Sequence, residues 1–275
     1  MKTILIPTDF SDNAWKAAGY AANLYQRIPC NFVIVHAFYL PSAIVEIDIA
    51  EHISSMSKGI NDQMSDFEKA FREFDIHPES TIKTVARYGI PSNMIQEQER
   101  DNFADVIIMG TTGSSISKNV VLGSVAIAVL DKASCPVICI PEKTELAPPN
   151  HIMFATDYNN VSNLEELLFL KEIAELHNAR ISIVNIEVDK PVNVSVEDEV
   201  EGIVLHNFFG EIEQNYFVHQ DEDVETGILN FSNQKRIDLI VTMKREHGFW
   251  KNIFHQSVTQ GLGLHSNIPL LVLKK

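Results

Sequence analysis

An internal repeat is the feature of this 275-residue sequence that most restricts its fold. The heptapeptide Ile4–Phe10 (ILIPTDF) returns 148 positions later as Ile152–Tyr158 (IMFATDY), and Asp105–Ile108 (DVII) returns 133 positions later as Asp238–Val241 (DLIV). Because self-similarity across half of a chain indicates one structural unit used twice, we expect two copies of one domain. The proline-containing segment 141–150 lacks apolar periodicity and is typical of a linker, so the predicted domains cover residues 1–144 and 149–275.

Short apolar runs alternate with helical patterns within the first copy. Strands are predicted at 2–7, 32–38, 81–86, 106–109 and 137–140, and helices at 14–28, 56–74, 91–100 and 124–133. Ser11 is a natural N-cap for the first helix. Continuously apolar strands that alternate with helices predict a parallel sheet covered on both faces. The predicted fold class is therefore α/β, with two tandem doubly wound domains that each contain a five-stranded parallel sheet flanked by helices.

Composition excludes several classes of function. The formal net charge of −15 argues against nucleic-acid binding, which needs a basic surface. No segment approaches the roughly 18–20 consecutive apolar residues of a membrane span. The start of the chain has too short an apolar run for a signal peptide, since Pro7 and Asp9 interrupt it. A cytoplasmic protein without membrane contact is expected.

No metal site is predicted. Three cysteines cannot form a disulfide framework, and Cys135 and Cys139 flank an apolar strand, which favours buried packing over a metal pair. Two acidic clusters, Glu197–Glu201 and Asp221–Glu225, lack the glycine and terminal glutamate of an EF-hand loop. Both clusters are therefore predicted to be solvated loops.

The most informative motif runs from the fourth strand to the fourth helix. Gly110 and Gly113 follow the strand, and after nine further residues Gly123 and Ser124 open the helix. Backbone N–H groups at a glycine-rich turn and a helix N-terminus bind phosphate well. Ser124 could either cap its own helix or donate to a phosphate oxygen. The spacing fits neither a P-loop nor G-x-G-x-x-G. Lys118 is the only cation in this loop, and it either reaches a terminal phosphate or lies on the solvated surface.

The loop resembles the Gly-2x-Gly-9x-Gly-Ser/Thr signature of the ATP-binding universal stress proteins. Pro7–Ser11 (PTDFS) resembles the Pro-Thr-Asp-x-Ser that ends the first strand in that family, and the resemblance extends through both halves. It implies an adenine nucleotide α-hydrolase-like fold and an ATP site, with or without Mg²⁺. The implied contacts to adenosine are Pro7, Thr8, Asp9 and Ala37, and those to ribose and phosphates are Gly110, Gly113, Gly123, Ser124 and Val125. The alternative for Asp9 is capping of the helix that follows, although Ser11 is better placed for that.

The second copy departs from this signature. At the 133-residue offset, Met243, Glu246 and Gln256 replace the three glycines, and only Ser257 matches Ser124. A carboxylate at position 246 would repel phosphate. Thr156 and Asp157 persist and are expected to serve packing or capping. His247 and His255 lie near this altered loop, but no third metal ligand stands at helical spacing.

The function favoured by the sequence is a nucleotide-dependent stress-response module with an unidentified protein partner. Two alternatives stay open: a nucleotide-independent scaffold, and a slow ATPase. No catalytic constellation is present, and the Ser-Gly-Gly-x-Asp-Ser type of loop of the ATP-consuming enzymes in the wider group is missing. The apolar runs 137–140 and 270–273 are expected at sheet edges, where they would join the two domains as an intrachain pseudo-dimer, with a homodimer as a further assembly.

One nucleotide per chain is predicted, bound by the N-terminal half. Calorimetric titration of the separately produced halves should detect ATP binding only to the N-terminal one, because only that half keeps the three glycines. ATP binding by residues 148–275 alone would contradict this prediction.

Overall fold

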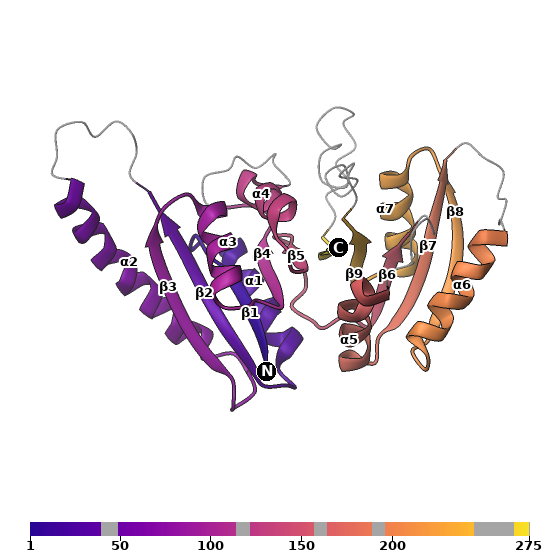
Figure 1. Cartoon of the computed structure of the whole chain (residues 1–275), viewed down its shortest axis with the longest axis horizontal. Helices are drawn as coiled ribbons and strands as arrows, with labels where there is room; N and C mark the ends of the chain where they lie inside the picture. The colour runs from indigo at the N-terminus through magenta and orange to yellow at the C-terminus, as the bar shows by residue number, and fades with distance from the viewer. Residues whose placement is uncertain (40–48, 114–121, 157–163, 189–195, 245–266, 275) are drawn as a thin grey trace. The chain divides into compact units, whose positions relative to one another are not determined.

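The computed structural model describes residues 1–39, 49–113, 122–156, 164–188, 196–244 and 267–274. The chain divides into two compact units, Met1–Ala147 and Pro148–Lys275. Each unit is an α/β domain with a parallel sheet and helices packed against it (Figure 1). The predicted fold class of two tandem doubly wound domains is confirmed.

Strands and helices alternate throughout the first unit. Its elements are β1 (Lys2–Pro7), α1 (Asp12–Tyr25), β2 (Cys30–Phe38), α2 (Ile49–Phe71), β3 (Thr81–Tyr88), α3 (Pro91–Asp101), β4 (Val106–Gly110), α4 (Ser124–Lys132) and β5 (Val137–Ile140). The strand order within this unit is β3-β2-β1-β4-β5, and all neighbours are parallel. The chain moves outward from β1 on one side and then continues from β4 on the other. The junction of β1 and β4 is therefore the topological switch point.

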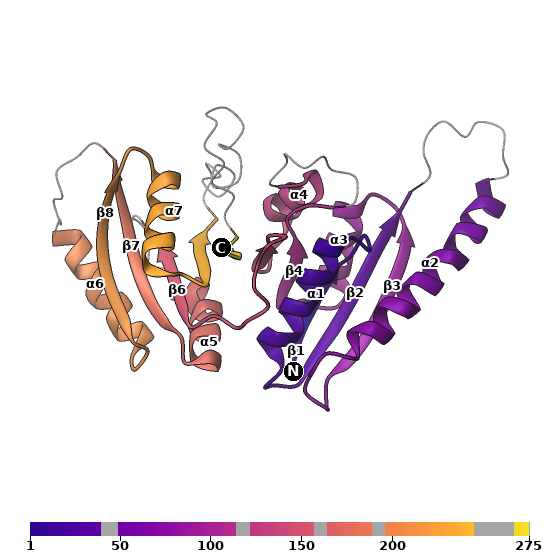
Figure 2. The ribbon, with the colours of Figure 1, turned by 180° about the vertical axis from the view of Figure 1, so that it is seen from behind.

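Helices cover both faces of this sheet because right-handed crossovers reverse face when the direction of winding reverses. Helices α1 and α2 share one face, where the rings of Trp15 and Phe67 lie 4.9 Å apart. Helices α3 and α4 cover the opposite face, as the two views in Figures 1 and 2 show. Helix α1 buries Ala14, Ala17 and Ala18, whose small side chains let it pack closely against the sheet.

One aspartate in each unit fixes where its central strands begin, which explains part of the sequence repeat. Asp105 accepts a hydrogen bond from the backbone N–H of Thr3 at 2.7 Å, and its own N–H donates to the Thr3 carbonyl. Asp238 accepts from the N–H groups of Asn150 and His151, both at 2.9 Å, and donates its N–H to the His151 carbonyl. The same carboxylate therefore sets the register of the two innermost strands in both units.

The second unit repeats the pattern with a shorter second helix. Its elements are β6 (His151–Ala155), a 3-10 turn (Leu164–Leu167), α5 (Leu168–His177), β7 (Arg180–Val188), α6 (Val196–Phe209), β8 (Gln214–Asp221), α7 (Val224–Lys235), β9 (Leu239–Met243) and β10 (Leu270–Leu273). Within this unit the strand order is β10-β9-β6-β7-β8, and all pairs are parallel.

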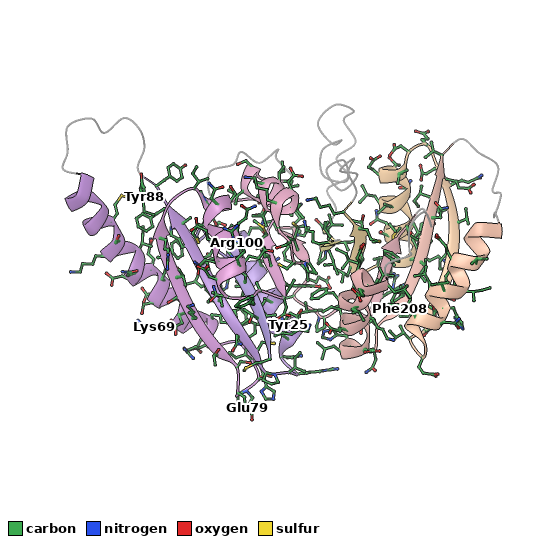
Figure 3. All side chains as sticks on the ribbon, in the orientation of Figure 1. Tyr25, Lys69, Glu79, Tyr88, Arg100 and Phe208 are labelled. Atoms are coloured by element: carbon green, nitrogen blue, oxygen red, sulfur yellow. The ribbon has the colours of Figure 1, made fainter. Side chains whose placement is uncertain are left out.

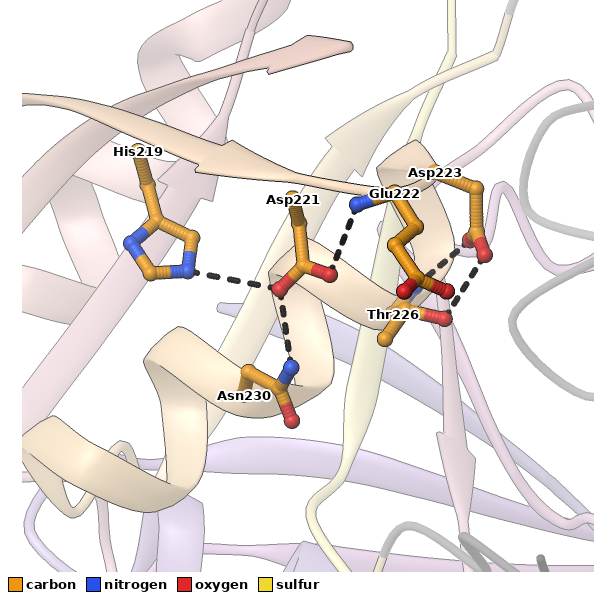
Figure 4. Close-up of polar contacts among 6 residues, drawn as sticks. All are labelled: His219, Asp221, Glu222, Asp223, Thr226 and Asn230. Atoms are coloured by element: carbon orange, nitrogen blue, oxygen red, sulfur yellow. Dashed lines mark hydrogen bonds and ion pairs between the residues drawn. The ribbon is translucent and has the colours of Figure 1, made fainter. Parts of the chain in front are cut away.

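The prediction of a solvated loop was wrong for the first of the two acidic clusters. Glu197–Glu201 lies inside α6. The other cluster joins β8 to α7 and is held by its own hydrogen bonds (Figure 4). Asp223 is the N-cap of α7 and accepts from both the backbone N–H and the hydroxyl of Thr226, each at 2.8 Å. Asp221 accepts from the Asn230 amide at 2.8 Å. These carboxylates therefore stabilise the start of a helix.

All three cysteines are free and buried, as packing residues should be. Burial raises the pKa of the Cys30 thiol to about 11, so this side chain stays a neutral thiol at physiological pH. Among the described residues, no helix is long and apolar enough to cross a bilayer.

A buried carboxylate ties α3 to the turn that follows α4. Glu99 is 5% exposed, and its Oε1 accepts from the Ser134 N–H and hydroxyl, both at 2.7 Å, and from the Cys135 N–H at 2.8 Å. One oxygen thereby satisfies three donors, which would otherwise be buried without partners.

Replacing Glu99 by alanine should lower the free energy of unfolding by about 3 kcal/mol, because three donors lose a charged acceptor. Glu99→Gln should lose less, since its amide oxygen can still accept. Denaturant unfolding would measure both variants. Glu97→Ala on the exposed face of α3 is the matched control and should change stability by less than about 0.5 kcal/mol. A Glu99→Ala value as small as that of the control would contradict the assignment.

Candidate functional site

A cavity of about 950 Å³ opens at the carboxyl ends of the central strands of the first unit. Its walls come from the ends of β1, β2 and β4 and from the first turns of α3 and α4. Tyr88, labelled in Figure 3, ends β3 at the same edge of the sheet. This is the edge where doubly wound sheets bind their ligands, because strand ends and helix N-termini meet there.

The cavity brings together all of the sequence-predicted site residues. Its lining includes Pro7, Thr8, Asp9, Ala37, Gly110, Gly113, Gly123, Ser124 and Val125. Their roles toward a ligand stay predictions. Lys118 lies outside the described residues.

Asp9 is held by a local turn at the end of β1. Its Oδ1 accepts from the N–H of Ser11 at 3.1 Å and from the Ser11 hydroxyl at 2.6 Å. The cap of α1 is Ser11 itself, which accepts from the Ala14 N–H. Between them Phe10 has a φ of 63°, a left-handed conformation that is uncommon for an aromatic residue. Strained backbone of this kind is found at functional sites, and its neighbour Asp9 lines the cavity.

The two loop glycines are required by other residues of the site. A Cβ built on Gly113 would lie 2.5 Å from Asp9 Oδ2, so only glycine lets the carboxylate occupy its place. A Cβ on Gly110 would lie 2.9 Å from the Asn13 side-chain nitrogen and 3.1 Å from the Asn13 carbonyl oxygen. The sequence suggested that glycines at these positions let a ligand approach closely. The structure adds a second reason for glycine, because side chains of the protein itself occupy the space that a Cβ would fill.

Asn13 is a supporting residue that the sequence did not reveal. It is 5% exposed, and its amide nitrogen donates to the Thr112 hydroxyl at 3.0 Å and to the Thr112 carbonyl at 3.3 Å. Helix α1 therefore braces the segment that follows β4. The Oδ1 of Asn13 is buried without a hydrogen-bond partner, which lowers the stability of the fold. The hydrogen bonds that the same side chain donates to Thr112 offset this cost.

Helix α4 presents an open N-terminus to the cavity. Gly123 is its N-cap and no side chain caps it, so Ser124 is the first helical residue and does not serve as the cap. The Gly123 N–H donates to the Thr111 carbonyl at 2.7 Å, which ties the start of α4 to the end of β4. The next N–H groups, from Ser124 onward, precede the first intrahelical hydrogen bonds and carry the positive end of the helix dipole.

His36 supports the turn that carries Asp9. Its Nδ1 lies 2.8 Å from the Thr8 carbonyl, which can only accept, so Nδ1 carries the proton. The Phe10 ring covers the imidazole with a centroid separation of 4.4 Å. Burial lowers the pKa of His36 below its ordinary value of 6.5, against the opposing effects of the Thr8 hydrogen bond and the Asp9 charge.

The second unit keeps part of the frame of this site. The Thr156 N–H donates to the Val184 carbonyl at 3.0 Å, as the Thr8 N–H does to Val35 at 2.8 Å. Met243 ends β9 in the place that Gly110 has in β4. The other residues named for the second loop, Asp157, Glu246, His247, His255, Gln256 and Ser257, lie outside the described residues.

Comparisons with known proteins point to one family. The family model described as the universal stress protein family matches residues 1–141. Universal stress protein MJ0531 of Methanocaldococcus jannaschii is 31% identical over 147 residues, which are 50% of this chain and 81% of that protein. MJ0577 of the same organism is 27% identical over 157 residues, 52% of this chain and 96% of that protein. A solved universal stress protein structure from Archaeoglobus fulgidus covers 99% of this chain and 96% of its own, with a TM-score of 0.74 at 19% identity.

Stability should fall in acid partly through His36. The folded state holds His36 with a lowered pKa, so below about pH 6.5 the unfolded state binds the proton more readily and unfolding is favoured. The variant His36→Asn keeps a donor but cannot titrate, and it should lose less stability than the wild type between pH 7.5 and pH 5. Denaturant unfolding at the two pH values measures the difference, with His77→Asn as a matched histidine control. Equal losses in wild type and His36→Asn would contradict the role given to His36.

Proposed function

Since the chain belongs to the universal stress protein family, we propose that its N-terminal domain, residues 1–144, binds ATP and acts as a nucleotide-dependent module in a stress response. The observation that carries this proposal is the convergence of nine residues, from three strand ends and a helix N-terminus, on a single cavity. Residues 149–275 would form a second domain of the same kind that binds no nucleotide.

The two ends of the cavity suit the two ends of ATP. Near β2 and α3 the lining is mainly apolar and includes Val35, Phe38, Met94 and Ile95, which would contact the flat base. The Asp9 carboxylate would accept donors from adenosine. At the other end the open start of α4 would bind the phosphates through backbone N–H groups and the Ser124 hydroxyl.

Magnesium would enter with the nucleotide. Among the described residues, no group of three or more histidine, cysteine, aspartate or glutamate side chains is placed to hold a metal ion. The hard Mg²⁺ ion typically takes phosphate oxygens and water and needs few protein ligands. Slow hydrolysis would follow from holding the phosphates and the metal ion in place, without being the purpose of the site.

The second domain favours a role in protein contact. The start of α7 is closed by Asp223, whereas α3 at the equivalent place has no side-chain cap. Asp221, Glu222 and Asp223 place carboxylates at this edge, so an anionic ligand would be repelled (Figure 4). A nucleotide-independent scaffold is the alternative that this acidic edge supports. Under that alternative, ATP would cause no thermal shift and Gly123→Val would behave as the wild type.

ATP should stabilise the full-length chain against unfolding, by about 2.7 kcal/mol at a concentration 100-fold above Kd. Gly113→Ala should weaken binding at least tenfold, because the new Cβ at 2.5 Å displaces the Asp9 carboxylate while the flexible side chain yields without loss of fold. Gly59→Ala is the matched control: its Cβ meets nothing within 4 Å, so the same substitution should leave ATP binding unchanged. Calorimetry and thermal unfolding measure both variants. Equal ATP affinity in the two variants would contradict the site.

A further inference from the structure

Ser92 is a buried polar residue on the cavity wall that none of the predicted roles uses. It is the second residue of α3, lines the cavity and is 8% exposed. No residue in the described part of the chain supplies a hydrogen-bond partner for its hydroxyl. The hydroxyl oxygen stays accessible from the open cavity, so a bound ligand can take the place of water there.

The backbone at the start of α3 adds a second polar group. Pro91 has no N–H, and the N–H groups of Asn93 and Met94 both return to the Ile90 carbonyl, at 3.1 and 3.0 Å. The helix therefore offers the cavity one backbone donor, the N–H of Ser92, beside the Ser92 hydroxyl. A donor and a group that can accept stand side by side on one residue.

The open start of α3 is not a requirement of the fold. Asp223, the N-cap of α7, stands 133 positions after Ile90, the N-cap of α3, so the two helices begin at equivalent places. In α7 a side chain closes the helix by accepting from the N–H of Thr226. The first unit leaves the same place open and turns it toward a cavity.

The surroundings of Ser92 indicate which part of a ligand it meets. Pro91, Met94 and Ile95 also line the cavity beside it. These apolar side chains would gain contact with a flat heterocycle, whereas the phosphates are assigned to the start of α4.

We propose that Ser92 recognises the base of the bound nucleotide and selects adenine, an inference that rests on the function proposed above. The Ser92 N–H donates to a ring nitrogen of the base, and the Ser92 Oγ accepts from the exocyclic amine beside it. Guanine has the reverse order on the corresponding edge, a ring N–H and a carbonyl oxygen, so it would set donor against donor at the backbone. Ser92 is thus a specificity-determining residue.

A thermodynamic cycle with two nucleotides tests this assignment on the full-length chain. ATP and purine riboside triphosphate, which lacks only the exocyclic amine, are titrated into the wild type and into Ser92→Ala. The wild type should bind the analogue about fivefold more weakly than ATP, the value of one net hydrogen bond. Ser92→Ala should bind ATP about fivefold more weakly than the wild type and should no longer distinguish the two nucleotides. Asn93→Ala, an exposed neighbour outside the cavity lining, should behave as the wild type.

Other outcomes overturn the inference. If Ser92→Ala weakens both nucleotides equally, Ser92 contacts the sugar or phosphates instead of the base. If it weakens neither, Ser92 contacts no part of the ligand. A wild-type chain that binds no ATP at all would instead refute the proposed function, so the two failures are distinguishable.

Discussion

The adjacency of β1 and β4 is the constraint on which the first unit depends. The two strands are far apart in sequence, but they pair in parallel, and Asp105 locks their starts through the backbone of Thr3. Because the two strands are parallel and their starts are aligned, their carboxyl ends also lie side by side. The turn after β1 therefore meets the residues that follow β4. Asp9 and Gly113 lie against each other for that reason, and both line the cavity.

The loop glycines and their partners form a coupled set. Gly110 makes room for Asn13, which in turn holds Thr112, and Gly113 makes room for Asp9. In the second half both members of one pair have changed, since Val161 stands at the position of Asn13 and Met243 at that of Gly110. In the first unit a glycine is needed at position 110 because the Asn13 side chain lies against it, so the two positions depend on each other. A substitution of Asn13 would therefore relax the requirement for glycine at position 110.

Most of the architecture could be predicted because it depends on local patterns. The limits of β1 and β5 were predicted to the residue, and Ser11 caps α1 as expected. Helix α2 begins at Ile49, earlier than predicted, and the helical spacing of apolar residues does reach back to that point. The acidic run before α7 does contain the predicted loop, but the capping role of Asp223 was missed, although an aspartate at an N-cap is a readable signal.

The supporting residues of the site could not be predicted in the same way. Asn13 and Thr112 are 99 positions apart, and no periodicity connects them. Nothing in the local sequence separates Ser92 from other serines in helices, because its distinguishing feature is the cavity that it lines. Such roles come from tertiary contacts, which a single sequence does not encode in its spacing.

The Glu99 clamp has a mechanical consequence. Helix α3 begins at the cavity, and near its far end Glu99 grips the Ser134–Cys135 turn, where α4 ends and β5 begins. Both helices begin at the cavity and are joined at their opposite ends by these hydrogen bonds. Loss of the Glu99 carboxylate would therefore weaken the support of two walls of the cavity at once, from a distance of about one helix length.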